Sequence, residues 1–136
     1  MKSLTILLVD DDKIERLKFK KVCQKVNLNC SVLEAVNGEE AFDLLNDNKN
    51  AFDLIITDIN MPKMNGFEFL KALKSNVKLK PIPVVIMSTS ESKLDLKKGY
   101  GIGISGYFSK PLNYADYLNK VTSLLQYWHK ASLSNS

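Results

Sequence analysis

Five short apolar runs alternate with amphipathic segments along this chain, and this alternation constrains the fold more than any other feature of the sequence. The runs have the length of β-strands and cover Thr5–Val9, Cys30–Ala35, Leu54–Thr57, Val84–Met87 and Gly106–Phe108. Strands that alternate with helix-length segments are typical of repeated βα units around a parallel sheet. The sequence therefore predicts an α/β fold in which five parallel strands are flanked by five helices.

The segments between these runs place apolar residues at helical spacing. We predict helices over Ile14–Val26 and Gly38–Asn46, through the stretch from Phe67 to Leu73, over Glu91–Gly103, and from Tyr114 to Trp128. The fourth is the weakest, because it contains three glycines, each of which costs about 1 kcal/mol relative to alanine. We expect this helix to be mobile. A single domain over residues 1–130 is expected, followed by a frayed tail over Ala131–Ser136.

Polar residues stand at or just beyond the ends of four of the predicted strands. Asp10, Asp11 and Asp12 follow the first run, Asp58 the third, Ser88 the fourth, and Lys110 comes shortly after the fifth. The carboxyl ends of parallel strands meet at one edge of the sheet, where open α/β folds bind their ligands. We therefore expect carboxylates, a hydroxyl and an ammonium group to converge on one crevice.

This constellation resembles the receiver domain of two-component response regulators, and the resemblance runs from about Leu4 to about Leu125. It implies a flavodoxin-like, doubly wound (β/α)5 fold with strand order 2-1-3-4-5. It also implies that Asp58 accepts a phosphoryl group, that Lys110 is the essential lysine, and that Ser88 and Tyr107 are the switch residues. Such a domain catalyses only its own phosphorylation and dephosphorylation, so we expect a signalling switch rather than an enzyme with an external substrate.

The aspartate cluster predicts a magnesium site. Neighbouring carboxylates raise one another's pKa unless a cation neutralises them, and Mg²⁺ uses one or two carboxylates in an octahedral shell of oxygens. The expected ligands are Asp11 and Asp58 directly, Asp10 mainly through water, and the backbone carbonyl of Asn60. Asp12 is expected instead to cap the first helix by accepting from free amides near Glu15.

Two further expectations come from the same resemblance and concern the backbone near the site. The pair Lys110-Pro111 matches a lysine-proline pair whose peptide bond is usually cis in the family, and such a bond would aim the lysine side chain. Gly66, in the loop after Asp58, is expected to have a positive φ. The resemblance also implies that Asn60 and Ser90 occupy positions that in this family influence how quickly the phosphoryl group is lost.

Composition narrows the remaining possibilities. At 136 residues the chain fits one domain, without room for a separate output module, and no apolar run approaches the ~20 residues that span a bilayer. The net charge is +4, but no nucleic-acid-binding motif accompanies the lysines, so we expect neither nucleic acid nor membrane as a partner. The two cysteines, Cys23 and Cys30, are expected to be reduced and buried in a cytoplasmic protein.

The implied partners are a sensor histidine kinase or phosphotransfer protein as phosphoryl donor and a protein target that responds to phosphorylation. Tyr127 and Trp128 lie beyond the usual length of a receiver domain. Together with the segment Ile82–Ser90, they resemble the single-domain regulators associated with phytochrome-type kinases. That subgroup often dimerises through the region of the last helix. A homodimer formed there is therefore a further expectation.

Two other functions are compatible with parts of the pattern. A magnesium-dependent phosphatase resembling the haloacid dehalogenase family would use Asp10 as nucleophile and Asp12 as general acid, but it leaves Asp58 unexplained. A receiver-shaped interaction module without phosphate chemistry would be expected to have lost an acidic residue or the lysine.

The sequence Gly101-Ile102-Gly103-Ile104-Ser105-Gly106 matches a dinucleotide fingerprint, but it follows a helix and enters a strand, so we interpret it as turn glycines.

Overall fold

A computed structural model describes residues 3–47 and 49–131 of the chain. Five parallel strands form one sheet in the order β2-β1-β3-β4-β5. The strands are β1 (Leu4–Val9), β2 (Cys30–Ala35), β3 (Leu54–Thr57), β4 (Val84–Ser88) and β5 (Gly106–Ser109). The predicted fold class and strand order are confirmed.

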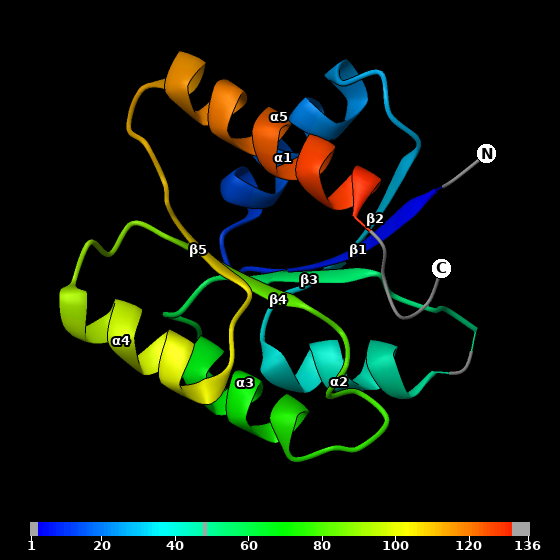
Figure 1. Cartoon of the computed structure of the whole chain (residues 1–136), viewed down its shortest axis with the longest axis vertical. Coiled ribbons are helices and arrows are strands. Elements are labelled where there is room, and N and C mark those ends of the chain that lie inside the picture. Colours follow the sequence, from blue (N-terminus) through cyan, green and yellow to red (C-terminus); the bar gives the residue numbers. More distant parts are fainter. Residues whose placement is uncertain (1–2, 48, 132–136) are drawn as a thin grey trace.

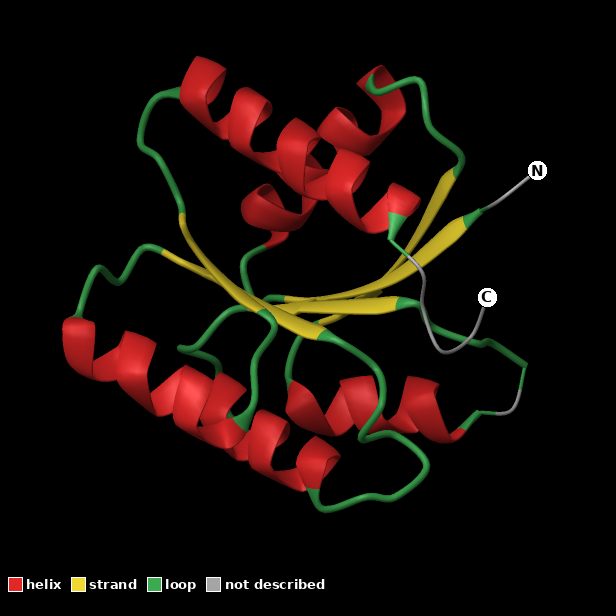
Figure 2. Ribbon diagram, viewed as in Figure 1, coloured by secondary structure: helices red, strands yellow, loops and turns green. Residues whose placement is uncertain are grey.

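Five helices cover the two faces of the sheet (Figures 1 and 2). One face carries α1 (Lys13–Lys25) and α5 (Tyr114–Lys130), and the other carries α2 (Gly38–Asn46), α3 (Gly66–Lys74) and α4 (Lys93–Ile102). Each face has its own apolar core. Alternate strand residues point to opposite faces, so Ile6 and Leu8 pack toward α1 and α5 while Leu7 and Val9 pack toward α2 and α3.

The helices begin where the sequence supplies an N-cap, an oxygen that accepts from a free amide of the first turn. Asp12, Asn37, Asn65, Ser92 and Asn113 cap α1 to α5 in that order. Ser92 explains why α4 starts at Lys93, two residues later than predicted. Of the three glycines interpreted as turn glycines, only Gly103 lies in a turn, where it ends α4 with a φ of 128° that would strain an L side chain; Gly101 lies in α4 and Gly106 in β5.

Two backbone expectations are wrong. The Lys110–Pro111 peptide is trans, as are all described peptide bonds. The trans form is the more stable one for most X–Pro bonds, and Lys110 reaches the site in this form. Gly66 does not have a positive φ, which belongs instead to Lys63, with a φ of 65°. Gly66 is required for space, because a Cβ there would collide with the backbone oxygen of Asp58.

The two cysteines are reduced, as predicted, but less buried than predicted. Cys23 of α1 and Cys30 of β2 are free and half-buried. Burial, reinforced by the neighbouring Cys30, raises the pKa of Cys23 to about 12, so its thiol is unreactive at neutral pH. No described helix combines the length and apolarity that a bilayer span needs. Most of the predicted tail, residues 132–136, lies outside the described residues.

Candidate functional site

Three carboxylates meet at the carboxyl edge of the sheet. Asp10 and Asp11 follow β1, and Asp58 follows β3, which is the neighbour of β1 in the sheet. The Asp58 amide donates to the carbonyl of Val9 at 2.9 Å, so the two strand ends are held in register. One oxygen from each carboxylate lies within 4.8 Å of the others, with Asp10 buried, Asp58 half-buried and Asp11 exposed. The predicted convergence of the carboxylates is present.

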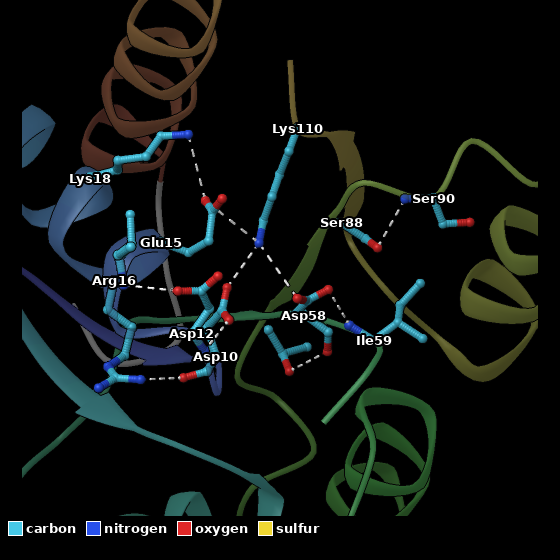
Figure 3. A network of polar contacts seen from close by, with 12 residues as sticks. Asp10, Asp12, Glu15, Arg16, Lys18, Asp58, Ile59, Ser88, Ser90 and Lys110 are labelled. Carbon is cyan, nitrogen blue, oxygen red and sulfur yellow. Dashed lines mark hydrogen bonds and ion pairs between the residues drawn. The ribbon is translucent and has the colours of Figure 1, made fainter. Parts of the chain in front are cut away.

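Lys110 extends from the end of β5 into this cluster (Figure 3). Its ammonium nitrogen lies 2.8 Å from Asp10 Oδ2 and 3.5 Å from Asp58 Oδ2, and all three side chains are mostly shielded from solvent. The second oxygen of each carboxylate accepts from a backbone amide. The Asp12 amide donates to Asp10 Oδ1 at 2.9 Å, and the Ile59 amide donates to Asp58 Oδ1 at 2.7 Å. Both carboxylates are therefore oriented before any ligand arrives.

The electrostatics of the cluster favour added positive charge. Burial, with help from the charge of Asp10, raises the pKa of Asp58 above its usual value despite the opposing ammonium of Lys110. Burial also works to lower the pKa of Lys110, but its hydrogen bond to Asp10 and the nearby carboxylates outweigh this and raise it. Lys110 thus remains charged, and one lysine does not fully compensate the acidic groups around it.

The donor set fits a magnesium ion. The three clustered groups are all hard oxygen ligands, one is exposed, and the net local charge is negative, which is what Mg²⁺ binding through a few carboxylates and retained waters requires. Asn60, whose carbonyl is the fourth expected ligand, lies two residues after Asp58 in an exposed loop. Asp12 is engaged as the N-cap of α1, where its carboxylate accepts from the Ile14 amide at 2.9 Å, as predicted.

Two charged residues of α1 belong to the surroundings of this site and were missed from the sequence. Arg16 donates to the backbone oxygen of Asp10 at 2.8 Å and also pairs with Glu34 of β2 at 3.0 Å. Glu15 places Oε2 at 3.9 Å from the ammonium of Lys110, and this buried oxygen has no hydrogen bond. Their place in the first turn of the helix after the aspartates was the only sequence signal for either residue, because the contacts themselves depend on how α1 packs against β2 and Lys110.

A chain of hydrogen bonds runs from Ser88 toward α4. Ser88 is the fully buried last residue of β4, and its hydroxyl oxygen accepts from the Ser90 amide at 3.2 Å. The Ser90 hydroxyl donates to Asp95, in the first turn of α4, at 2.7 Å. The Tyr107 hydroxyl of β5 donates to the Ser90 carbonyl at 3.0 Å. Ser90 therefore connects the two predicted switch residues, a role that no local sequence signal indicates.

The loop after Asp58 is fixed by the start of α3. The Gly66 amide donates to the Ile59 carbonyl at 2.8 Å. The backbone of Gly66 lies so close to that of Asp58 that no side chain fits between them. Asn65 and Glu68 form a capping box, in which each side chain accepts from the other residue's amide, at 2.9 Å and 3.0 Å. The position of Asp58 is thus coupled to α3.

Comparison with protein families gives a match to the response regulator receiver domain over residues 6–122. A curated relative, the probable transcriptional regulator ycf29 of Porphyra purpurea, is 35% identical over 123 residues, which cover 90% of this chain and 57% of that protein. This chain spans about half the length of the curated relatives that it matches first.

Solved structures of similar proteins have the same fold. The phosphorylated cyanobacterial phytochrome response regulator RcpA superposes with a TM-score of 0.91 at 30% identity, covering 97% of this chain and 99% of that one. The Mn²⁺-bound form of the response regulator Rcp1 gives a TM-score of 0.89 at 29% identity, covering 96% of this chain and 98% of that one. Both likenesses extend over almost the whole of each chain.

Proposed function

Because this chain belongs to the response regulator receiver family, we propose that Asp58 is its phosphoacceptor and that phosphorylation of Asp58 switches a protein-binding surface. The observation that carries this proposal is the pairing of Lys110 with both Asp10 and Asp58 at one sheet edge, beside the exposed Asp11. Residues 1–130 form the receiver domain in this proposal. The reaction is a transfer to the protein itself, not turnover of a substrate.

The transfer requires little covalent chemistry from the protein. An oxygen of the Asp58 carboxylate attacks phosphorus, and an O–P bond forms as the bond to the donor's imidazole nitrogen breaks. The electron pair of the broken bond stays on the donor nitrogen. Because the transition state is loose, the catalytic contributions are alignment and neutralisation of charge. The Ile59 amide holds one oxygen of Asp58, which leaves the oxygen beside Lys110 to react.

Several residues have distinct proposed roles around the phosphoryl group. Asp11 and Asp58, with Asp10 through water and the Asn60 carbonyl, would hold Mg²⁺, which when bound supplies positive charge to the phosphoryl oxygens. The ammonium of Lys110 exchanges its contact with Asp58 for one with a phosphoryl oxygen. The Ser88 hydroxyl donates to another oxygen, and Tyr107 responds to the movement of Ser88 through Ser90.

A histidine kinase or phosphotransfer protein is the proposed donor, and the cytoplasm is the proposed compartment. The similarity to RcpA supports a phytochrome-type kinase as the source of the signal. For dimerisation we propose the region of α5, where Tyr127 is exposed and lines a groove with Trp128 and Phe108. Light scattering before and after phosphorylation tests this pairing, and a Tyr127→Glu variant that still dimerises would contradict it.

Intact-protein mass spectrometry tests the central proposal. The protein is incubated with acetyl phosphate, with and without Mg²⁺, together with Asp58→Asn and Asp10→Asn variants. We expect one phosphoryl increment that requires Mg²⁺ and is absent from Asp58→Asn. An adduct that persists in Asp58→Asn but disappears in Asp10→Asn would instead support the phosphatase chemistry. That alternative is disfavoured because the Asp12 carboxylate, its general acid, is occupied in capping α1.

A further inference from the structure

The positive charge of the chain is concentrated in one segment. Residues 71–104 contain seven lysines and two acidic residues, whereas the rest of the chain contains 12 basic and 13 acidic residues. The net charge of +4 therefore arises entirely from this segment, which covers the second half of α3, the connection to β4, β4 itself and α4. Its lysines do not pair with the aspartates of the acidic site and play no part in the proposed phosphoryl transfer.

Five of these lysines form one surface, which we call the lysine surface. Its members are Lys71 and Lys74 of α3, Lys78 and Lys80 of the following connection, and Lys98 of α4. The Lys74 ammonium donates to the Lys80 carbonyl at 3.1 Å, and a Cβ on Gly103 at the end of α4 would lie 3.4 Å from the Lys74 stem. Lys98 lies over the ring of Phe67, 4.6 Å from its centroid, so the middle of α4 contacts the start of α3.

Four lysines of the lysine surface have no carboxylate partner among the described residues. Within residues 3–47 and 49–131, no carboxylate lies within ion-pair distance of Lys71, Lys74, Lys80 or Lys98. On the opposite face two lysines of α1 do have carboxylate partners, since Lys18 pairs with Glu15 at 3.7 Å and Lys20 with Glu34 at 2.8 Å. The α3 dipole accounts for the two lysines near its C-terminus, but not for those of the connection and of α4.

Lys74 is held close to a like charge. Partial burial, and then the neighbouring ammonium of Lys80, lower the pKa of Lys74. An anion at this point would relieve the repulsion between the two ammonium groups. Val77, between these lysines in sequence, is 90% exposed and adds an apolar contact of the kind that protein interfaces use.

We propose that the lysine surface binds an acidic segment of a partner protein. Lysine side chains favour carboxylates as partners here, because each carries a compact ammonium charge at the end of a flexible chain. The lysine surface contains no arginine, the residue whose planar fork suits phosphate. Lys74 and Lys80 lie at the opposite end of α3 from Gly66, which is the residue that contacts the Asp58 backbone, so binding there and phosphorylation of Asp58 are compatible.

Fluorescence anisotropy with a labelled polyglutamate peptide tests this proposal on the full chain. We expect binding that weakens as ionic strength rises to about 0.15 M, where charges are screened over about 8 Å. A K71E/K80E variant reverses two exposed charges and should weaken binding on the order of tenfold. The matched control, K21E/K130E, changes the net charge equally on α1 and α5 and should stay within about twofold of the wild-type affinity.

A second variant and two other probes complete the test. Lys74→Gln removes the charge beside Lys80 while keeping a polar side chain and should also weaken binding, with circular dichroism verifying the fold. Equal losses in K71E/K80E and K21E/K130E, or no peptide binding at low salt, would overturn the proposal. Tighter binding of single-stranded DNA or of phosphatidylglycerol vesicles through these lysines would overturn the assignment to an acidic protein.

Discussion

Helices α3 and α4 contact each other on the same face of the sheet, but they are held there in different ways. α3 buries five of its nine residues, namely Gly66, Phe67, Phe69, Leu70 and Leu73. α4 buries one of its ten residues, Gly99. The N-terminus of α4 is instead connected by polar contacts to Ser90, which bonds to both Ser88 and Tyr107.

This difference separates a fixed element from an adjustable one. Apolar burial makes displacement of α3 costly, so α3 can hold the backbone of Asp58 in place through Gly66. Hydrogen bonds at one end of α4 can be exchanged at much lower cost, because each contributes about 1 kcal/mol net. A polar change at Asp58 is therefore expected to move α4 and leave α3 where it is.

Truncation of a core residue in α3 should give the largest effect. Phe69 is fully buried and its ring meets Phe42 edge to face, with centroids 5.3 Å apart. Phe69→Ala should lower the free energy of unfolding by about 3 to 5 kcal/mol. The counterpart in α4, Leu94→Ala, removes a side chain that is 75% exposed and should change it by less than about 0.5 kcal/mol. Urea unfolding measures both, and similar losses would abolish the distinction between the helices.

Glycine replacements should give the next largest contrast. In Gly66→Ala the new Cβ would collide with the Asp58 backbone and lie 2.9 Å from Ile59 Cα, so we expect a loss of about 2 kcal/mol and slower phosphorylation of Asp58. A Cβ added to Gly101 of α4 would have no atom within 4 Å, and Gly101→Ala should stabilise the protein by about 0.5 kcal/mol. Thermal unfolding and acetyl phosphate kinetics distinguish the two variants. Normal kinetics in Gly66→Ala would show that α3 does not position Asp58.

A serine replacement tests the polar attachment of α4. Ser90→Ala removes the bond to Asp95 and should cost about 1 kcal/mol, seen as faster amide exchange in the first turn of α4 but not in α3. Ser75→Ala is the matched control, because the Ser75 hydroxyl donates to the Lys71 carbonyl at the exposed end of α3. If α4 exchanges at the wild-type rate in Ser90→Ala, its N-terminus is held by other contacts.

The smallest expected effect is on the free energy of unfolding, which the buried charge of Asp58 lowers. Because burial raises its pKa in the folded state, ionised Asp58 lowers stability above the unfolded-state pKa, near 3.8. Asp58→Asn should therefore stabilise the metal-free protein at neutral pH, and the gain should disappear as pH falls below about 4. Urea unfolding at several pH values, with Asp11→Asn as control, measures this. A gain that persists at about pH 3 would contradict the assignment to ionisation.

Much of the fold could be predicted because its signals are local. Apolar runs such as Leu54–Thr57 identify buried parallel strands, and the residues that follow them necessarily share one edge of the sheet. The convergence of Asp10, Asp58 and Lys110 could be predicted for this reason. The reason for Gly66 could not be predicted, because it depends on how closely the backbone of α3 approaches that of Asp58.

The sequence by itself determined which elements form and which chemical groups reach the acidic edge, because periodicity and strand ends are properties of the chain alone. Only the tertiary structure decided how these groups are held. Arg16 supports the Asp10 backbone, Ser90 connects Ser88 with Tyr107, and Lys74 lies beside Lys80. These contacts join α1 to β1, β4 to β5, and α3 to the connection that follows it. They depend on distances between elements, which the order of residues does not specify.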